Sequence, residues 1–249
     1  MEIYPAIDLY EGKVVRLERG DYEKRKVYSS DPKAIARRWI GEGARWLHVV
    51  DLEGARSGEI KNWEALKQIL SEKKVSVQFG GGVRRLEDLE QLLPLGVKRI
   101  ILGTKVLEPL FLKQVSQAHG PNIALSLDLR GEAVQVEGWL RSGGKSVFDL
   151  LGELKEVSVA CLIITDIERE GTLTGINLPK FQRLLERSPF PVIFSGGITS
   201  LEDIRSLVSL KAKRLDGIII GKALYEGAVD LREALSLAQG RRNSDNGLG

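Results

Sequence analysis

Several residue types are scarce in this sequence of 249 residues, and each shortage excludes a class of site. The single cysteine, Cys161, cannot form an internal disulfide, and its apolar neighbours predict a buried side chain rather than a reactive thiol. With two histidines and one cysteine, we expect no metal site of the zinc type. The sequence also lacks Gly-x-Gly-x-x-Gly and P-loop patterns, so we expect no nucleotide cofactor.

Long hydrophobic runs and a strong net charge are lacking as well. No apolar run approaches the roughly 18 residues of a membrane span, and the N-terminal residues form no leader pattern, so we expect a cytoplasmic protein without a membrane partner. The 37 basic and 34 acidic residues leave a net charge of +3, which is too small and too mixed for a nucleic-acid-binding surface. Any anion that the protein binds should therefore be small and locally recognised.

Short apolar, β-branched runs are what the sequence has in number. Such near-continuous runs are typical of strands covered on both faces. The stretches between them place apolar residues three or four apart, as helices do, for example from Leu86 to Leu93 and from Leu201 to Val208. Asp31 before Pro32, and Ser200, are in addition typical helix N-caps. The eight runs end at Asp8, Asp51, Phe79, Leu102, Asp128, Thr165, Ser195 and Ile220.

Eight strand and helix units in about 240 residues predict an α/β protein of the (βα)8 TIM-barrel type. An open doubly wound sheet fits less well, because it usually has five or six strands. We expect one domain over residues 1–240. The last residues, 241–249, are polar and lack periodicity, and we expect them to form a flexible tail.

The two halves of the chain repeat each other. The glycine pair Gly81-Gly82 after one apolar run corresponds to Gly196-Gly197 after another, and 196 minus 81 gives an offset of 115 residues. Asp8 corresponds to Asp128 at an offset of 120. These offsets predict two duplicated half-barrels, at about 1–120 and 121–240. Two equivalent sites that face one cavity suit a substrate with two similar ends.

Glycines at four predicted strand ends indicate where such a substrate would bind. Turns that lead from a strand into a helix expose backbone N–H groups, and this geometry holds phosphate. The alternative for any one glycine is a tight turn chosen for its backbone conformation. Arg84 and Arg19, at loop tips, could neutralise phosphate or be solvated. The repeated glycine turns, which predict two phosphate sites across the barrel mouth, are Gly82, Gly103-Thr104, Gly197 and Gly221-Lys222.

Carboxylates at the predicted strand ends are the candidates for chemistry. Asp8 and Asp128 end the first and fifth strands, which lie opposite each other in a ring of eight, so they could serve as base and acid. Their alternative role is to orient loops. Asp51, and in the same way Asp166, either contacts a substrate hydroxyl or supports a neighbouring group. The polar loop after the sixth strand, with Thr165, Glu170 and Thr172, is of the kind that closes over ligands.

Seven motifs in order, from about Met1 to about Gly240, resemble the ProFAR isomerase family of histidine biosynthesis. They read PAIDLYEGKVVRLERGDY, HVVDLEGARSGEIKN, FGGGVR, LDLRGEAVQVEGW, TDIEREGTLTGIN, SGGI and IIIGKALYEG. The resemblance implies an aldose–ketose isomerase with a duplicated (βα)8 barrel and no cofactor. Its reaction is the Amadori rearrangement of ProFAR, an aminoaldose with a phosphate at each end, to the aminoketose PRFAR.

The same resemblance implies roles for individual residues. It makes Asp8 the general base and Asp128 the general acid, with Thr165 assisting. In the family the loop after the sixth strand usually reads Asp-Gly-Thr, whereas this chain has Glu170-Gly171-Thr172, so the acid is either Asp128 or Glu170. Lys222 stands where the family commonly has Arg, and Trp139 either stacks on the substrate or packs. The substrate- and phosphate-binding residues expected in all are Arg19, Gly20, Asp51, Gly81, Gly82, Arg84, Gly103, Thr104, Trp139, Gly171, Thr172, Gly196, Gly197, Gly221 and Lys222.

Other functions remain open at this point. A dual isomerase that also accepts phosphoribosyl anthranilate would have the same motifs, because its specificity lies in mobile loops. The sister cyclase of imidazole glycerol phosphate synthesis usually ends its first strand in Cys-Leu-Asp, where this chain has Ala6-Ile7-Asp8. A catalytically idle barrel that binds phosphosugars or acts as a scaffold would not need opposed carboxylates. We expect a monomer with a small diphosphate substrate as its only partner.

Overall fold

A computed structural model describes residues 1–18, 20–139 and 141–245 of the chain. In this part, eight parallel strands pair in the order β1, β4, β5, β6, β7, β10, β11, β12 and back to β1. The sheet therefore closes on itself as a barrel, as predicted. The barrel strands are β1 (Glu2–Tyr10), β4 (Trp46–Asp51), β5 (Ser76–Gly80), β6 (Arg99–Leu102), β7 (Ile123–Arg130), β10 (Cys161–Asp166), β11 (Val192–Ser195) and β12 (Leu215–Ile220).

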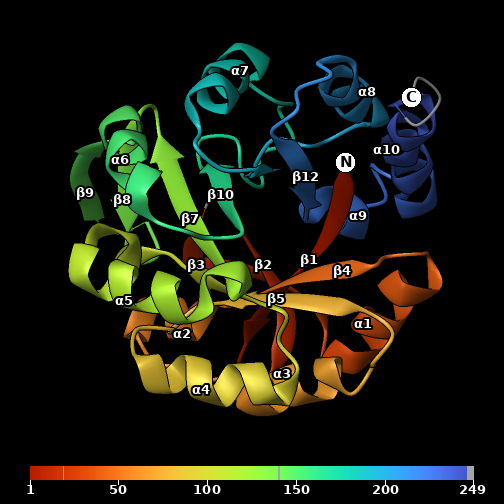
Figure 1. The fold of residues 1–249 in the computed structure, drawn as a ribbon. Helices are drawn as coiled ribbons and strands as arrows, with labels where there is room; N and C mark the ends of the chain where they lie inside the picture. Colours follow the sequence, from red (N-terminus) through yellow and green to blue (C-terminus); the bar gives the residue numbers. More distant parts are fainter. Residues whose placement is uncertain (19, 140, 246–249) are drawn as a thin grey trace.

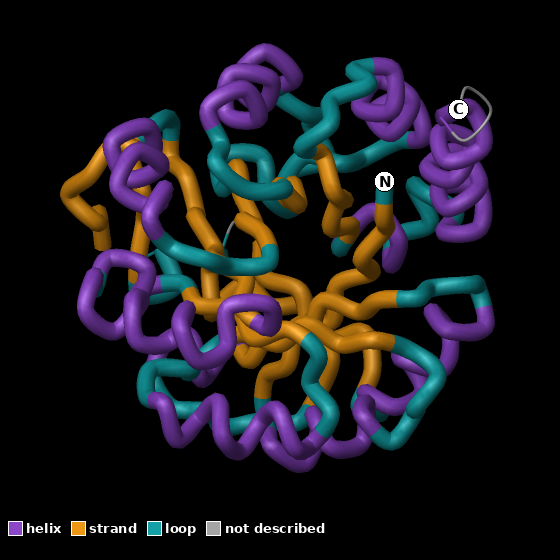
Figure 2. Tube along the Cα trace, viewed as in Figure 1, coloured by secondary structure: helices purple, strands orange, loops and turns teal. Residues whose placement is uncertain are grey.

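Helices surround the strands, which gather at the centre of Figures 1 and 2, and α10 lies beside β1. The α-helices are α1 (Pro32–Gly41), α2 (Leu52–Ser57), α3 (Trp63–Leu70), α4 (Leu86–Leu95), α5 (Pro109–His119), α6 (Val147–Glu153), α7 (Leu178–Arg187), α8 (Leu201–Ser209), α9 (Lys222–Tyr225) and α10 (Leu231–Asp245). Three short 3-10 helices are η1 (Thr104–Leu107), η2 (Gly120–Asn122) and η3 (Leu154–Glu156). None of the described helices is long and apolar enough to cross a membrane.

The predicted helix starts are confirmed by their capping contacts. The Asp31 side chain accepts a hydrogen bond from the Ala34 N–H at 2.9 Å, with Pro32 in the first helical turn. The Ser200 hydroxyl accepts from the Asp203 N–H at 3.2 Å, and Asp203 in return accepts from the Ser200 N–H. Each contact satisfies backbone donors that the first turn leaves unpaired. Local sequence therefore sets where these helices begin.

Two antiparallel hairpins that the sequence analysis did not predict extend the barrel. β2 (Lys13–Glu18) and β3 (Asp21–Ser29) follow β1, whereas β8 (Ala133–Val136) and β9 (Arg141–Ser146) follow β7. The prediction relied on continuous apolar runs, and the outer strands DYEKRKVYS and RSGGKS are polar. Each hairpin rises from the end of a strand that carries a candidate catalytic aspartate.

Two apolar clusters stabilise the barrel. Alternate residues of each strand, such as Ile3 and Ile7 of β1, point outward and pack in a large cluster with the helices. The residues between them, such as Tyr4 and Ala6, point inward and form a smaller cluster inside the barrel. Cys161 belongs to this inner cluster and is buried as predicted. The inward set decides which side chains reach the centre of the fold.

The ends of the predicted domain are only partly described. The tail that we predict for residues 241–249 overlaps α10, which continues to Asp245, and residues 246–249 lie outside the described part. The boundary at residue 240 and the duplication of the half-barrels stay predictions. The described ranges contain no group of three His, Cys, Asp or Glu side chains that could hold a metal ion.

Candidate active site

Every barrel strand contributes to one cavity at the C-terminal mouth of the barrel. Its lining includes Asp8 from β1, Asp128 from β7 and Thr165 from β10. A smaller cavity beside it is lined by residues that follow β10, β11 and β12. In this fold, side chains at the C-terminal ends of the strands are the ones that meet a substrate.

Most of the sequence-predicted site residues line these two cavities. Glu170 lines both. Thr172 and Asp51 line neither, and Arg19 lies outside the described residues. The main cavity holds Asp8, Gly20, Gly81, Gly82, Arg84, Gly103, Thr104, Asp128, Trp139, Thr165 and Glu170. The smaller one adds Gly171, Gly196, Gly197, Gly221 and Lys222.

Asp8 shares a buried arginine with Glu170. Arg16 of β2 donates from Nη1 to Asp8 Oδ2 at 2.8 Å and from Nη2 to Glu170 Oε1 at 2.7 Å, and only 10% of its side chain is exposed. Burial raises the pKa of Asp8 to about 6; Arg16 opposes this rise and Glu170 adds to it. The Asp8 carboxyl can therefore exchange a proton near neutral pH.

Asp128 has a different set of partners. Its Oδ2 accepts a hydrogen bond from Trp139 Nε1 at 2.8 Å, and the Thr165 hydroxyl bonds the same carboxyl from the neighbouring strand. Burial raises the pKa of Asp128, while the hydrogen bonds from Trp139 and Thr165 limit the rise. No arginine or lysine pairs with this carboxyl among the ion pairs of the described residues. The two aspartates thus differ in surroundings although they end corresponding strands.

Trp139 joins the two halves of the cavity. Besides its bond to Asp128, its indole ring packs on Gly20, where a Cβ atom would lie 2.3 Å from Trp139 Cε3. Trp139 has a positive φ of 73°, which is uncommon for a bulky residue and indicates that tertiary contacts hold it. Its indole therefore lies across the cavity rather than on the outer surface.

The glycine turns have the same geometry in both halves. Gly81 and Gly196 have φ values of 99° and 91°, and a Cβ atom on either would meet the carbonyl oxygen of Asp51 or Asp166, respectively. Gly103 and Gly221 cap η1 and α9 with similar backbone angles. Gly81 and Gly196 must therefore be glycine because of their positive φ and the nearby carbonyl oxygen. The backbone N–H groups of both pairs of turns are available at the cavity lining.

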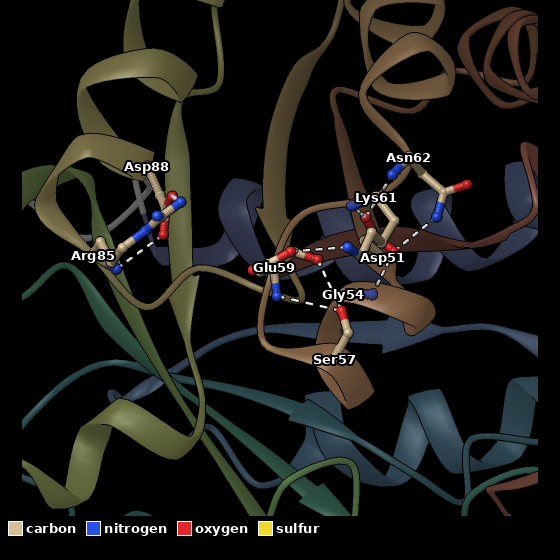
Figure 3. Close-up of polar contacts among 8 residues, drawn as sticks. All are labelled: Asp51, Gly54, Ser57, Glu59, Lys61, Asn62, Arg85 and Asp88. Atoms are coloured by element: carbon tan, nitrogen blue, oxygen red, sulfur yellow. Dashed lines mark hydrogen bonds and ion pairs between the residues drawn. The ribbon is translucent and has the colours of Figure 1, made fainter.

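Asp51 lines neither cavity, and Figure 3 shows its carboxylate among Gly54, Lys61 and Asn62. It is fully buried; Oδ1 accepts hydrogen bonds from Gly54 N–H and Asn62 Nδ2, and Oδ2 accepts from the Lys61 and Asn62 N–H groups, all at 2.7 to 2.8 Å. The carboxylate thus fastens α2 to the following loop. Of the two expected roles, the geometry favours support of a neighbouring segment, and a contact with substrate stays a prediction.

Other expected binding residues are held by neighbouring loops. Lys222 Nζ donates to the Gly171 carbonyl at 3.0 Å, which ties the turn after β12 to the loop after β10. The Thr172 hydroxyl donates to the Arg169 carbonyl inside its own loop, so in this arrangement it does not reach a cavity. Thr104 Oγ1 accepts from the Glu137 N–H and so connects to the loop of Trp139.

Two residues in the cavity had no role in the sequence analysis. Arg16 lies in the strand KVVRLE, where a charged residue interrupts an apolar pattern, and this was the signal available for it. His48, within the strand β4, also lines the main cavity. Arg16 and His48 come into the same cavity because β2 and β4 both pair with β1, and no local sequence pattern predicts this pairing.

Comparison with known proteins gives a consistent family. Residues 2–230 match the model of the family described as "Histidine biosynthesis protein". A protein of Gloeobacter violaceus is 44% identical over 246 residues, which cover 98% of this chain and 96% of that protein. Proteins of Desulforamulus reducens and Sinorhizobium medicae are 43% and 44% identical, and the matched parts cover 97% or more of each chain. All three are named 1-(5-phosphoribosyl)-5-((5-phosphoribosylamino)methylideneamino)imidazole-4-carboxamide isomerase.

Proposed function

The chain belongs to the histidine biosynthesis protein family, and from this premise we propose that it is the isomerase that converts ProFAR into PRFAR. One observation carries the proposal. Asp8 and Asp128 lie two residues before the C-terminal ends of β1 and β7, which are opposite strands of the barrel, and both line the main cavity. A proton can therefore be given on one side of a bound sugar and taken on the other.

The reaction needs two proton transfers before the product forms. An acid first protonates the ring oxygen of the ribose, so that the C1–O bond breaks and the C1–N bond becomes an imine. A base then removes the C2 proton to give an enolamine, which gains a proton at C1 and loses the proton of its 2-hydroxyl as it tautomerises to the ketone. No electron acceptor is needed, because the hydrogen lost from C2 is replaced at C1. Two carboxyl groups of different proton affinity suffice.

We assign the base to Asp8 and the acid to Asp128. With a pKa of about 6, Asp8 is mostly ionised at pH 7, and Arg16 keeps one oxygen of the carboxylate in place. Asp128 has a raised pKa, and no arginine or lysine of the described residues forms an ion pair with it, which favours the proton that an acid must give. Glu170 has an oxygen already bound to Arg16, so its part is to hold Arg16 rather than to protonate the sugar.

The assignment of the acid has a direct test. We expect Asp128→Asn to lower kcat by about 10²- to 10⁴-fold, because an amide cannot donate the proton. Glu170→Gln should cost less, and mainly through Arg16. Binding of PRFAR to both variants, measured by calorimetry, controls for a damaged cavity. A larger loss of kcat in Glu170→Gln than in Asp128→Asn would move the acid to Glu170.

The glycine turns of the main cavity and those of the smaller cavity beside it would each take one phosphate of the substrate. Backbone N–H groups at η1 and α9, with Arg84 and Lys222 nearby, suit this role. The proposal has the chain act as a cytoplasmic monomer, without metal, nucleic acid or membrane.

Turnover of ProFAR by the purified protein, followed by the absorbance change, tests the function. We run phosphoribosyl anthranilate in parallel. Turnover of ProFAR alone is the expected result, whereas turnover of both would indicate a dual isomerase. Binding of ProFAR without turnover would refute the isomerase and leave the cyclase or a binding barrel.

A further inference from the structure

A chain of hydrogen bonds runs through the barrel interior, from its N-terminal end to the floor of the main cavity. Tyr4 of β1 donates to Asp216 Oδ2 at 3.3 Å and accepts from Arg99 Nη1 at 3.4 Å. Arg99 also donates to Gln78 Oε1 at 3.0 Å. Gln78, fully buried, meets His48 Nδ1 through its Nε2 at 2.9 Å. The two end members are thus a carboxylate at the barrel rim and an imidazole at the cavity.

The chemistry of these groups fixes the direction of each bond. An arginine can only donate, so the Gln78 atom that faces Arg99 must be the amide oxygen. The amide nitrogen then faces His48 and can only donate, so Nδ1 of His48 must be the bare nitrogen that accepts. The imidazole proton of a neutral His48 is therefore on Nε2.

His48 stays neutral in this position. Burial, together with the positive charge of Arg16 as the smaller cause, lowers its pKa to about 3. Since Nδ1 is occupied by Gln78 and the residue lines the main cavity, Nε2 is the ring nitrogen left for a ligand. The ring thus offers one N–H donor of fixed position, on the strand beside β1, where His48 pairs with Ala6, two residues before Asp8.

The corresponding positions in the second half of the barrel hold no such group. His48 pairs with Gln78 across β4 and β5, and Gln78 pairs with Arg99 across β5 and β6. In the other half, the same registers pair Ile163 with Ile193 and Ile193 with Gly217. The interior is therefore polar under one half of the cavity and apolar under the other, although the turns above the two halves match.

We propose that Gln78 and Arg99 are positioning residues that hold His48 as its Nε2–H tautomer, and that this N–H donates a hydrogen bond to an oxygen of the bound substrate. The proposal rests on the proposed function. A substrate with a phosphate at each end could enter a nearly twofold cavity in two orientations. One donor on the first half distinguishes them, because the two ends of the substrate differ and each orientation presents a different group to His48.

The tautomer can be read directly by NMR. The chain has two histidines, so a protein labelled with ¹⁵N-histidine gives two imidazoles, and His119→Asn assigns them. We expect the long-range nitrogen–proton spectrum of His48 to show the Nε2–H pattern, unchanged between pH 5 and pH 8 (a range well above a pKa of about 3). A His48 in the Nδ1–H form, or charged at neutral pH, would overturn the proposal.

Gln78→Glu tests the positioning role. The carboxylate still accepts from Arg99 but cannot donate, so the imidazole proton should move to Nδ1 or the ring should become charged. We expect kcat/KM for ProFAR to fall by about 10- to 100-fold. Arg99→Met frees the amide to rotate and should give a mixture of tautomers. Ile193→Val, at the position in the second half that corresponds to Gln78, should leave the spectrum and the kinetics unchanged.

Two outcomes separate this proposal from the function on which it rests. A Gln78→Glu protein with an altered tautomer but unchanged kcat and KM would overturn the substrate contact. A wild-type protein that fails to turn over ProFAR would refute the isomerase instead. The tautomer of His48 in the free protein would still show whether Gln78 positions the imidazole.

Discussion

At the scale of the residue, the buried charge of Asp8 lowers the stability of the fold and also provides the proposed catalytic base. Its folded-state pKa of about 6 exceeds the ordinary 3.8, so the folded protein binds the proton more tightly than the unfolded chain does. The contribution of this proton to the free energy of unfolding is fully present below about pH 4 and is lost as the pH rises through about 6. Keeping an ionised base at neutral pH therefore costs folding free energy.

Asp8→Asn separates the two consequences of that charge. We expect kcat to fall by about 10²- to 10⁴-fold. At pH 7.5 the free energy of unfolding should rise by about 1 to 3 kcal/mol, the upper value being the full pKa difference and the lower one allowing for Arg16 losing a partner. At pH 4 the rise should vanish. Urea unfolding at both pH values measures it.

The matched control is Glu64→Gln, the same change of charge at an exposed site on α3. It should alter stability by less than about 0.5 kcal/mol at either pH. If Asp8→Asn were destabilising at pH 7.5, its ion pair with Arg16 would outweigh the cost of burial, and the assigned cause would be wrong.

At the scale of the element, the turns after β5 and β11 are shaped by what lies against them. Gly82 has a φ of 84°, and a Cβ atom there would lie 2.5 Å from the carbonyl carbon of Glu59. Gly197 is in the same position relative to Gly175. The turns can lie this close to the neighbouring loops only without a side chain, and this packing presents their N–H groups to the cavity.

Gly82→Ala should therefore damage both stability and binding. We expect a loss of about 2 to 4 kcal/mol, from positive φ and from overlap with the backbone, together with a higher KM for ProFAR. Gly12→Ala measures the cost of positive φ alone, because Gly12 has a φ of 70° but nothing within 4 Å of a Cβ atom. It should lose only about 1 kcal/mol. If denaturant unfolding gave the same loss of unfolding free energy for Gly82→Ala and Gly12→Ala, overlap with the neighbouring backbone would not contribute.

At the scale of the whole molecule, Arg84 lines the main cavity and Lys222 lines the smaller cavity beside it. Arg84 belongs to the first half, and its guanidinium packs against Gly58. Lys222 belongs to the second half and is held by the Gly171 carbonyl. The two cations share no contact among the described residues, so each should act on one phosphate of the substrate alone.

Arg84→Met and Lys222→Met should each raise the KM for ProFAR by about tenfold, with little change in kcat, because phosphate binding is uniform between ground and transition states. In the double variant the two effects should multiply, since independent sites add within about 0.5 kcal/mol. Steady-state kinetics of the four proteins gives the coupling. A double variant no worse than either single one would mean that both cations serve the same phosphate.

The sequence by itself determined the eight strands, the helix starts and the end positions of Asp8 and Asp128, because these follow from local periodicity, capping and one rule of the barrel fold. Only the tertiary structure decided which side chains meet. Arg16 reaches Asp8 and Glu170 from β2, which pairs with a polar outer strand that the apolar pattern did not predict, and Glu170 lies 154 residues away from it in sequence. Four hydrogen bonds hold the Asp51 carboxylate away from the cavity lining, and no residue spacing in the sequence predicts them. His48 gains its tautomer from β5 and β6, since the direction of a hydrogen bond depends on its partners across the barrel rather than on neighbours along the chain.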